Sequence, residues 1–311
     1  TLAKDFWGRP MNILHAVKEA DFEVKAGETL GIVGESGSGK SVTMRSILRL
    51  LPPKASLSGS IIVDGENVIE MSQDQLSNMR GRDVSMIFQE PMVAFDPVYK
   101  VGYQIAETVV RHLGTSFEDA LARAKELFDL VQIPSAKNRL SAYPHELSGG
   151  MRQRAMIALA LACSPKLLLA DEPTTALDAT VQIQILLLLR QLQRELGMSI
   201  IFVTHDVGVA TEIADELAVM YAGKIVEIGD VADVIKKPAH PYTQGLLSST
   251  VNSESKGKRL EVIGGSPPDM SKLFKGCAFS PRCKKVLDQC WHQQPAPCLL
   301  YTSDAADDPT C

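Results

Sequence analysis

The fold class of this chain can be predicted from one segment, Gly34-Glu35-Ser36-Gly37-Ser38-Gly39-Lys40-Ser41. It follows the apolar run Leu30-Gly31-Ile32-Val33, which is typical of a buried strand, and it precedes Val42 to Leu48, which reads as the opening of a helix. Glycines allow successive backbone N–H groups to turn inward onto an anion, and the helix dipole adds positive potential there. A strand, a glycine-rich loop and a helix N-terminus together predict a phosphate-binding site in an α/β fold.

Lys40 and Ser41 make this phosphate site more specific. With the glycines they complete the P-loop pattern G-x-x-x-x-G-K-[ST], in which the lysine reaches the β- and γ-phosphates and the hydroxyl ligates Mg²⁺. A glycine-rich turn without a ligand is the alternative interpretation. Because both flanks have the required strand and helix patterns, we expect the chain to bind a nucleoside triphosphate.

Length and composition limit the other possibilities. The chain has 311 residues, which is more than one compact domain usually holds, so we expect a core domain with appendages. A net charge of -5 argues against a nucleic-acid partner held by phosphate neutralisation. The most apolar runs, Ala155 to Cys163 and Ile185 to Leu189, are too short to span a membrane. Any link to a membrane is therefore expected to come through a partner.

A second polar site follows another apolar run. Leu167 to Ala170 ends in Asp171-Glu172, and the carboxyl end of a buried strand is where an α/β sheet places ligand chemistry. We expect Asp171 to hold Mg²⁺ directly or through water, and Glu172 to orient and polarise the attacking water. A pair of strand-end charges without a chemical role is the alternative interpretation.

Three further sites in the sequence place polar groups at the end of a predicted strand or at the start of a predicted helix. The run Val84 to Phe88 ends at Gln89, and the predicted strand Ser199 to Val203 has His205 at its tip, where it could contact a γ-phosphate. Although a lone histidine is usually structural, this one is expected beside the strand of the acidic pair. Ser148-Gly149-Gly150 combines a helix N-cap with exposed backbone N–H groups, which is a second anion-binding design.

The periodicity of the chain changes between about 92 and 160. Ala106 to Leu113 and Phe117 to Val131 have helical periods, so a helical block interrupts the α/β alternation. Elsewhere, the alternation in Ala20 to Val24 predicts a strand before the P-loop, and Ala218 to Glu227 predicts a hairpin.

In this order and spacing, the motifs resemble the nucleotide-binding domain of an ABC transporter. The P-loop is Walker A, Gln89 lies in the Q-loop, and Leu147 to Met151 is the signature that other P-loop ATPases lack. Walker B is Leu167 to Glu172, and the D-loop and the switch histidine follow at Ala176-Leu177-Asp178 and His205.

The resemblance implies a fold and a domain plan. It implies a P-loop NTPase (RecA-like) nucleotide-binding domain over residues 1–250, with an inserted α-helical subdomain at about 92–160 and an antiparallel β subdomain. It also implies a C-terminal extension over residues 251–311. In this family two domains pair head to tail, so Ser148, Gly149 and Gly150 are expected to serve a partner's ATP. An aromatic residue upstream of Walker A stacks on adenine, which by position favours Phe6, with Trp7 as the alternative.

The resemblance also assigns roles within the site. The expected catalytic residues are Lys40, Gln89, Glu172 and His205. The expected Mg²⁺ ligands are Ser41, Gln89 and Asp171. The expected nucleotide contacts are Phe6, Gly34, Glu35, Ser36, Gly37, Ser38, Gly39, Lys40, Ser41, Thr43, Gln89, Ser148, Gly149, Gly150, Asp171 and Asp178.

Longer stretches narrow the family. The chain is similar to the ATP-binding subunits of bacterial oligopeptide/dipeptide/nickel importers in Gly31 to Ser41, Met86 to Met92, Tyr143 to Arg154, His240-Pro241-Tyr242-Thr243 and Gly276 to Cys283. One departure is Val93 to Pro97, where the family more often has a Ser-Leu-Asn-Pro run. This similarity implies an ATP-hydrolysing subunit at the cytoplasmic face of the inner membrane. The implied partners are a second, related ATPase subunit, two membrane permease subunits and an extracytoplasmic solute-binding protein.

Other functions remain open at this level. The same machinery could import nickel or another small solute instead of peptides. A soluble ABC ATPase acting on ribosomes or DNA would show two fused cassettes or a long coiled-coil insertion, and this sequence has neither. In a further interpretation, the C-terminal extension is mainly a regulatory module that senses iron or redox state.

The cysteines raise a separate question. Cys277, Cys283, Cys290 and Cys298 are separated by five, six and seven residues, a set that suits a Cys₄ site for zinc or an iron–sulfur cluster. The absence of a C-x₂-C pair argues against zinc-finger geometry. Some members of the resembled family carry a [4Fe–4S] cluster here, which favours iron–sulfur, while free thiols are the alternative. Cys163 is expected to be a core residue and Cys311 to be unrelated to the site.

Overall fold

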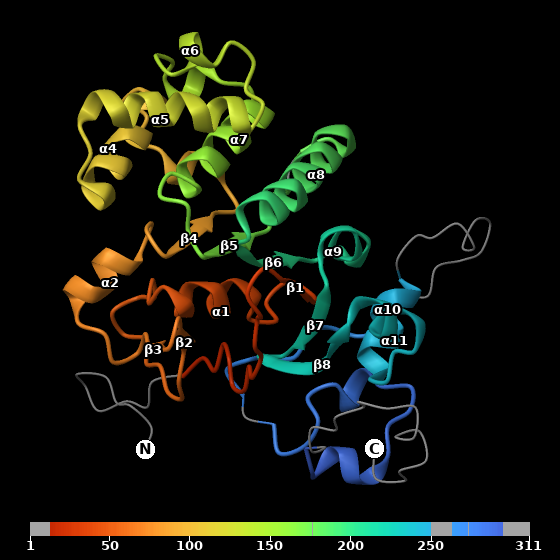
Figure 1. The fold of residues 1–311 in the computed structure, drawn as a ribbon. Coiled ribbons are helices and arrows are strands. Elements are labelled where there is room, and N and C mark those ends of the chain that lie inside the picture. The colour runs from red at the N-terminus through yellow and green to blue at the C-terminus, as the bar shows by residue number, and fades with distance from the viewer. Residues whose placement is uncertain (1–12, 176, 250–262, 273, 295–311) are drawn as a thin grey trace.

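A central sheet carries the site. The computed structural model describes residues 13–175, 177–249, 263–272 and 274–294, and its main sheet has the strand order β4-β5-β6-β1-β7-β8 (Figure 1). The strands are β1 (Thr29–Val33), β4 (Val84–Ile87), β5 (Leu167–Asp171), β6 (Ser199–Thr204), β7 (Glu216–Tyr221) and β8 (Lys224–Asp230). Neighbours from β4 to β7 are parallel, and β8 runs antiparallel to β7 as the predicted hairpin.

The parallel register brings the polar strand ends together. Every residue of β1 and β4 is buried, as expected for strands covered on both faces. Val33 at the end of β1 pairs with Thr204 of β6, and Asp171 at the end of β5 pairs with Val203. The P-loop, the acidic pair and the segment before His205 therefore leave the sheet at the same edge, where ligands bind in α/β sheets.

Helices connect and cover the strands. Their bounds are α1 (Lys40–Ile47), α2 (Gln73–Met79), α3 (Pro91–Ala94), α4 (Val101–Leu113), α5 (Phe117–Leu130), α6 (Ala136–Arg139), α7 (Gly149–Ala160), α8 (Ala179–Leu196), α9 (Val207–Ile213), α10 (Val231–Lys236) and α11 (Pro241–Ser248). Short 3₁₀ turns lie at η1 (Pro144–Glu146), η3 (Ser280–Arg282) and η4 (Asp288–Trp291). Among the described residues, no helix is long and apolar enough to cross a membrane.

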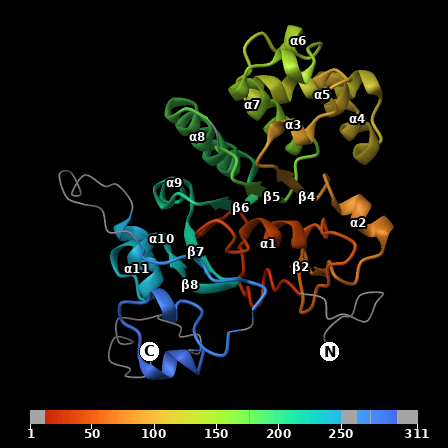
Figure 2. The same ribbon diagram turned by 180° about the vertical axis from the view of Figure 1, so that it is seen from behind.

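The inserted helical block is a lobe of its own. In both views α4, α5, α6 and α7 gather above β4 and β5, whereas α1 lies below β5 and β6 (Figures 1 and 2). The predicted helices are confirmed, although α4 begins at Val101, five residues before the clearest part of its pattern. Phe128 and Met156 of the lobe belong to the same buried cluster as Leu168 and Ile200 of the sheet, so the lobe is packed onto the strands.

The segments around the P-loop strand depart from the sequence prediction. The antiparallel β subdomain consists, in the described part of the chain, of β2 (Ile62–Val63) and β3 (Glu66–Asn67). The predicted strand Ala20 to Val24 is wrong, because these residues are coil and only Glu19 bridges to Lys224. Phe22 and Val24 still pack against the core. Alternating apolar and polar residues indicate that one face of a segment is buried, but a strand also needs a neighbouring backbone to form hydrogen bonds with.

The C-terminal part of the chain packs on the sheet edge. In Figures 1 and 2, α10, α11 and the blue described segment after residue 263 lie beside β7 and β8. Phe279 of this segment shares a buried cluster with Tyr221 of β7 and Tyr242 of α11. Cys163 is buried with 8% of its surface exposed, as predicted, and it lies in the turn after α7.

Candidate functional site

The P-loop is shaped by close packing at two of its glycines. A Cβ atom on Gly34 would lie 2.2 Å from the Met220 carbonyl oxygen, and one on Gly39 would lie 2.6 Å from the Ala16 carbonyl oxygen. Gly39 also has a φ of +108°, which side chains rarely tolerate. Strand β7 and the N-terminal segment thus press on the loop from outside, and only glycine fits at these contacts.

Lys40 lies across the loop. Its side chain is buried, and its Nζ donates hydrogen bonds to the carbonyl oxygens of Gly34 at 2.7 Å and Glu35 at 3.0 Å. Burial lowers the pKa of Lys40, while the carboxylates of Glu172, Asp171 and Glu35 act in the opposite direction. An ammonium group at the start of α1 suits a polyphosphate, because the helix N-terminus adds unpaired N–H donors.

Ser41 and Asp171 meet beside the lysine. The Ser41 hydroxyl donates to Asp171 Oδ1 at 2.8 Å, and only 2% of Asp171 is exposed. Burial raises the pKa of Asp171, and the hydrogen bond from Ser41 is the main opposing effect. A hydroxyl and a carboxylate are oxygen ligands of the kind that Mg²⁺ prefers, so this pair fits that ion. Ser38 supports a polar ligand nearby, because its buried hydroxyl has no hydrogen-bond partner among the described residues.

Glu172 connects three strand ends. Its Oε2 accepts hydrogen bonds from Gln89 Nε2 at 3.4 Å and from Thr175 Oγ1 at 3.0 Å, and it lies 3.2 Å from Nδ1 of His205. Gln89 follows β4, Glu172 follows β5 and His205 follows β6, so the sheet order assembles the group. The structure therefore brings together three of the residues that the sequence singled out.

Glu172 also has an unusual backbone conformation. Its φ is +48°, in the left-handed region that residues other than glycine seldom adopt, and its N–H donates to the Val203 carbonyl at 3.0 Å. Such strain persists where the surroundings hold it, and it concentrates at functional sites. Sequence reasoning missed Thr175 in this group, and the only signal was a hydroxyl residue three positions after the glutamate.

Other predicted residues lie apart from this cluster. Ser148 caps α7 by accepting from Met151 N, and Asp178 caps α8 by accepting from Val181 N. Helix α7 belongs to the upper lobe, whereas α1 lies below β5 and β6 (Figures 1 and 2), so one chain does not bring Ser148, Gly149 and Gly150 to its own P-loop.

The remaining residues predicted to contact the nucleotide differ in how exposed they are. Ser36 and Gly37 are exposed on the P-loop. Thr43 is buried, and its hydroxyl donates to the Gly39 carbonyl at 3.1 Å, so the structure gives no support for its predicted contact with the nucleotide. Phe6 and Trp7 lie outside the described residues.

The described cysteines do not support a metal cluster. Cys277, Cys283 and Cys290 are free thiols, and the Cys277 N–H donates to the Cys290 carbonyl at 2.8 Å. Within the described ranges, no group of three or more His, Cys, Asp or Glu residues could hold a metal ion. Cys298 and Cys311 lie outside those ranges.

Comparison with protein families identifies two matching regions. Residues 17–175 match the family model described as ABC transporter. Residues 226–290 match the model described as the C-terminal region of the oligopeptide/dipeptide transporter.

Curated relatives match over most of their length. A putative peptide import ATP-binding protein of Brucella melitensis is 50% identical, over 88% of this chain and 85% of the relative. The oligopeptide transport ATP-binding protein OppD of Salmonella typhimurium is 46% identical, over 90% of this chain and 84% of the relative.

Solved structures share the fold. A dimeric ATP-binding cassette in a post-hydrolysis state, bound to ADP and Pi, has a TM-score of 0.62 and 29% identity, covering 70% of this chain and 90% of that one. The protein cbiO1 from Clostridium perfringens, part of the ABC transporter complex cbiONQ, has a TM-score of 0.62 and 27% identity, covering 76% of this chain and 88% of that one.

Proposed function

This chain belongs to the ATP-binding subunits of ABC transporters, in the oligopeptide/dipeptide group, and from that premise we propose that it hydrolyses ATP to drive peptide import. The observation that carries the proposal is the convergence of Gln89, Thr175 and His205 on Glu172 Oε2, next to the Ser41–Asp171 pair. A carboxylate held by neighbours beside a phosphate-binding loop is the arrangement that ATP hydrolysis needs.

Each residue of the site has a distinct role in this proposal. Lys40 and the loop N–H groups bind the phosphates. Ser41, Asp171 and Gln89 would hold Mg²⁺, which would supply positive charge to neutralise the developing phosphate charge. Glu172 orients and polarises the attacking water, and His205 contacts the γ-phosphate. Three neighbours that fix one carboxylate oxygen limit its rotation, so its position is set before substrate arrives.

The separated signature residues point to a second subunit. Ser148, Gly149 and Gly150 lie at the N-terminus of α7, and Ser148 and Gly149 are exposed there. A helix N-terminus attracts phosphate, so this surface is suited to the ATP held by another subunit. We expect the partner to be a related ATPase subunit rather than a second copy of this chain.

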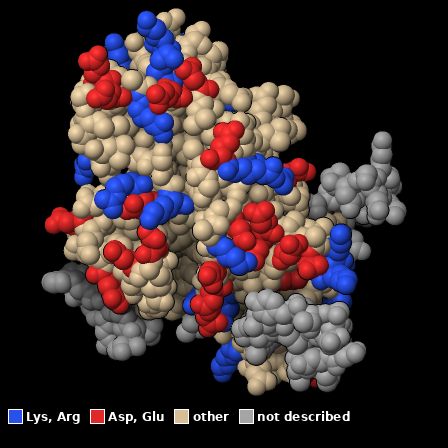
Figure 3. Space-filling view, viewed as in Figure 1, with Lys and Arg blue, Asp and Glu red and all other residues tan. Residues whose placement is uncertain are grey.

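The helical lobe offers a surface for membrane subunits. Val93, Val98 and Tyr99, which lie on α3 and the segment that joins it to α4, are 69%, 67% and 52% exposed, so apolar surface is available to a partner there. Two permease subunits at the cytoplasmic face of the inner membrane, served by an extracytoplasmic solute-binding protein, would complete the importer. On the face that Figure 3 shows, basic and acidic side chains are mixed, which gives a nucleic acid no continuous basic surface there.

Peptides are the proposed cargo because the relatives described above are named for peptide import. The test reconstitutes this chain with its partner ATPase and permeases in liposomes and measures ATP hydrolysis and uptake of a labelled peptide. We expect both activities in the wild type, and neither with Glu172→Gln in this chain and the equivalent change in its partner. Nickel uptake without peptide uptake would reject the peptide assignment, and peptide uptake without ATP hydrolysis would reject the function.

The iron–sulfur cluster remains a prediction from the sequence alone. Iron and acid-labile sulfide assays on anaerobically purified protein test it directly. Roughly four irons per chain with absorbance near 400 nm would establish the cluster, and freely titrating thiols without iron would exclude it.

A further inference from the structure

We infer that Arg282, which lies in the C-terminal extension, is a positioning residue for the P-loop and acts through the side chain of Glu35. Arg282 would act on the ATP site proposed above, so its role rests on that function. It would give the extension a direct part in ATP binding, in addition to any docking or sensing role.

The contact between Arg282 and Glu35 is a bidentate ion pair. Arg282 Nη1 donates to Glu35 Oε2 at 2.7 Å, and Nη2 donates to Oε1 at 2.8 Å. The side chains are 5% and 25% exposed, so the pair is largely shielded from water. Two parallel charge-assisted bonds fix direction as well as distance, which a single ammonium group could not do.

Arg282 is itself held in place. Its Nε donates to the Gly264 carbonyl at 2.8 Å, and Nη1 also lies 3.3 Å from the Tyr221 hydroxyl. Phe279, three residues earlier, packs edge-on against Tyr221 with ring centroids 5.3 Å apart. The guanidinium group is therefore held by packed neighbours where it meets the P-loop, and it is not a mobile surface side chain.

Tyr242 holds the same loop residue by its backbone. Its hydroxyl accepts a hydrogen bond from the Glu35 N–H at 2.9 Å, and its ring is fully buried against Tyr221. This contact gives a physical role to Tyr242 in the His-Pro-Tyr-Thr motif, which the proposed function leaves unused. Arg282 thus holds the side chain of Glu35, and Tyr242 holds its N–H group.

Glu35 is the point where this support meets the catalytic lysine. Its carbonyl accepts a hydrogen bond from Lys40 Nζ at 3.0 Å, its N–H is bound by Tyr242, and its carboxylate is bound by Arg282. Glycines on either side, Gly34 and Gly37, give the loop conformational freedom that must be lost when ATP binds. Contacts that remove that freedom beforehand favour binding.

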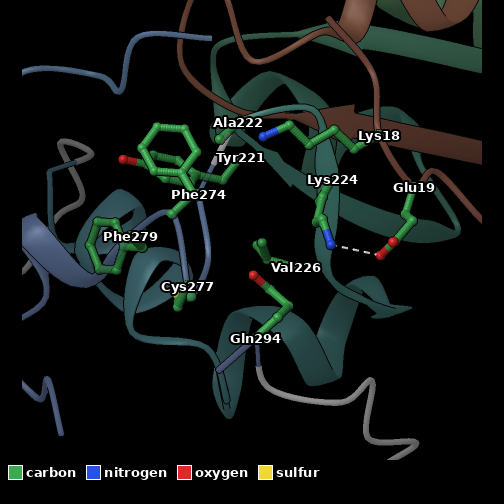
Figure 4. Close-up of a pocket in the computed structure, with 12 residues that line it drawn as sticks. Lys18, Glu19, Tyr221, Ala222, Lys224, Val226, Phe274, Cys277, Phe279 and Gln294 are labelled. Atoms are coloured by element: carbon green, nitrogen blue, oxygen red, sulfur yellow. Dashed lines mark hydrogen bonds and ion pairs between the residues drawn. The ribbon is translucent and has the colours of Figure 1, made fainter. Parts of the chain in front are cut away.

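The interface between the extension and the core also contains a cavity. It has a volume of about 160 Å³ and is lined partly by Lys18, Phe274 and Cys277 (Figure 4). Neither Arg282 nor Glu35 lines this cavity, so the ion pair is separate from it.

The test compares variants of the full chain by MgATP affinity and, in the assembled transporter, by KM and kcat for ATP hydrolysis. The variants are Arg282→Gln, Arg282→Lys, Glu35→Gln and the double variant Arg282→Gln/Glu35→Gln. Lys285→Met is the matched control, because Lys285 also ties the extension to the core, through Gln244 Oε1 at 2.9 Å, but does not contact the loop.

We expect Arg282→Gln and Glu35→Gln each to weaken ATP binding by roughly tenfold, because the loop must then be ordered at the moment when ATP binds. The KM for ATP should rise more than kcat falls, and Arg282→Lys should bind ATP more tightly than Arg282→Gln. The double variant should bind ATP no more weakly than the weaker single variant, because Arg282→Gln, Glu35→Gln and the double variant all break the same ion pair. Lys285→Met should bind ATP like the wild type.

Two results would overturn the inference. One is ATP affinity within about twofold of the wild type in folded Arg282→Gln and Glu35→Gln, with only the melting temperature lowered. The other is an equal loss of affinity in Lys285→Met. If Arg282→Gln does not fold, the isosteric Glu35→Gln decides. A wild type that binds no ATP would instead reject the proposed function, and the role of Arg282 with it.

Discussion

Glu172 combines a strained backbone with the densest set of side-chain contacts in the site. Its φ of +48° costs conformational energy, and such strain is retained mainly where the position of the side chain is needed for function. The sequence could not predict this, because nothing in the letters Asp-Glu-Pro specifies a positive φ. The neighbouring strand imposes it by accepting the Glu172 N–H at the Val203 carbonyl.

Replacement of Glu172 by Gln should separate binding from hydrolysis. Gln has the same shape and keeps an acceptor for Gln89 and Thr175, but it cannot act as a base. We expect the ATPase rate to fall by about 10² to 10⁴-fold while ATP affinity stays near that of the wild type. Rapid-quench kinetics and equilibrium nucleotide binding measure the two quantities. The exposed Glu107→Gln on α4 is the control, and an unchanged rate in Glu172→Gln would remove the glutamate from the chemistry.

His240 should make stability depend on pH. Its half-buried ring accepts the Tyr242 N–H at Nδ1, and burial lowers its pKa below the ordinary 6.5, with Glu227 opposing. The unfolded chain therefore binds a proton at higher pH than the folded one, so this contribution to stability is full above pH 6.5 and is lost as the pH falls below it.

The variant His240→Asn tests this effect, because Asn keeps an N-cap acceptor and does not titrate. Urea unfolding at a series of pH values should show a smaller loss of stability on acidification in His240→Asn than in the wild type. Identical slopes in the two proteins would show that His240 is not the titrating group.

At the scale of elements, the helix boundaries follow local rules. Helix α8 begins after its N-cap Asp178 and ends at Gly197, which has a φ of +65°, so both ends agree with the sequence pattern. Helix α7 begins after Ser148 in the same way. Helical ends were predictable because caps and C-terminal glycines act within one turn of the chain.

Asp178 has two assigned roles that mutations can separate. Asp178→Ala removes the acceptor for Val181 N and should lower the free energy of unfolding by about 1 kcal/mol, whereas Asp178→Asn keeps a cap and should cost far less. If the charge also serves ATP hydrolysis, both variants should lose ATPase activity in the assembled transporter. Urea denaturation and ATPase assays check the two effects, and full activity in Asp178→Asn would leave Asp178 as a cap alone.

At the scale of the whole molecule, the two lobes divide the site. The lower part holds the P-loop and the acidic pair, and the upper lobe holds the signature at α7, so neither lobe of one chain completes a closed site (Figure 1). This separation supports the proposal of a second ATPase subunit.

Gly149 allows that proposal to be tested without disturbing the fold. A Cβ atom there would meet nothing within 4 Å, whereas at Gly150 it would lie 3.1 Å from Val181 Cγ1. Gly149→Ala should therefore leave stability and ATP binding by the isolated chain intact, yet lower the ATPase rate of the assembled transporter roughly tenfold or more. Calorimetry, nucleotide binding and ATPase assays measure these outcomes, and an equal loss of ATP affinity in the isolated chain would contradict the partner model.

Local sequence patterns were enough to predict the P-loop, the strand-end residues Gln89, Glu172 and His205, and the helical insertion. These follow from periodicity, turn chemistry and motif spacing, which are local properties of the chain. The sequence also predicted a strand at Ala20 to Val24 that does not form, because pairing depends on a backbone partner that the local pattern does not contain.

The contacts between these residues depend on the tertiary structure and could not be predicted from local patterns. The order of the parallel strands places Gln89, Glu172 and His205 at one edge, and the packing of the extension brings Arg282 to Glu35. Residues 35 and 282 lie at opposite ends of the chain, and no local rule relates them. Their contact exists because Phe279, Tyr221 and Tyr242 bury a shared apolar surface, and burial of that surface is a property of the whole fold.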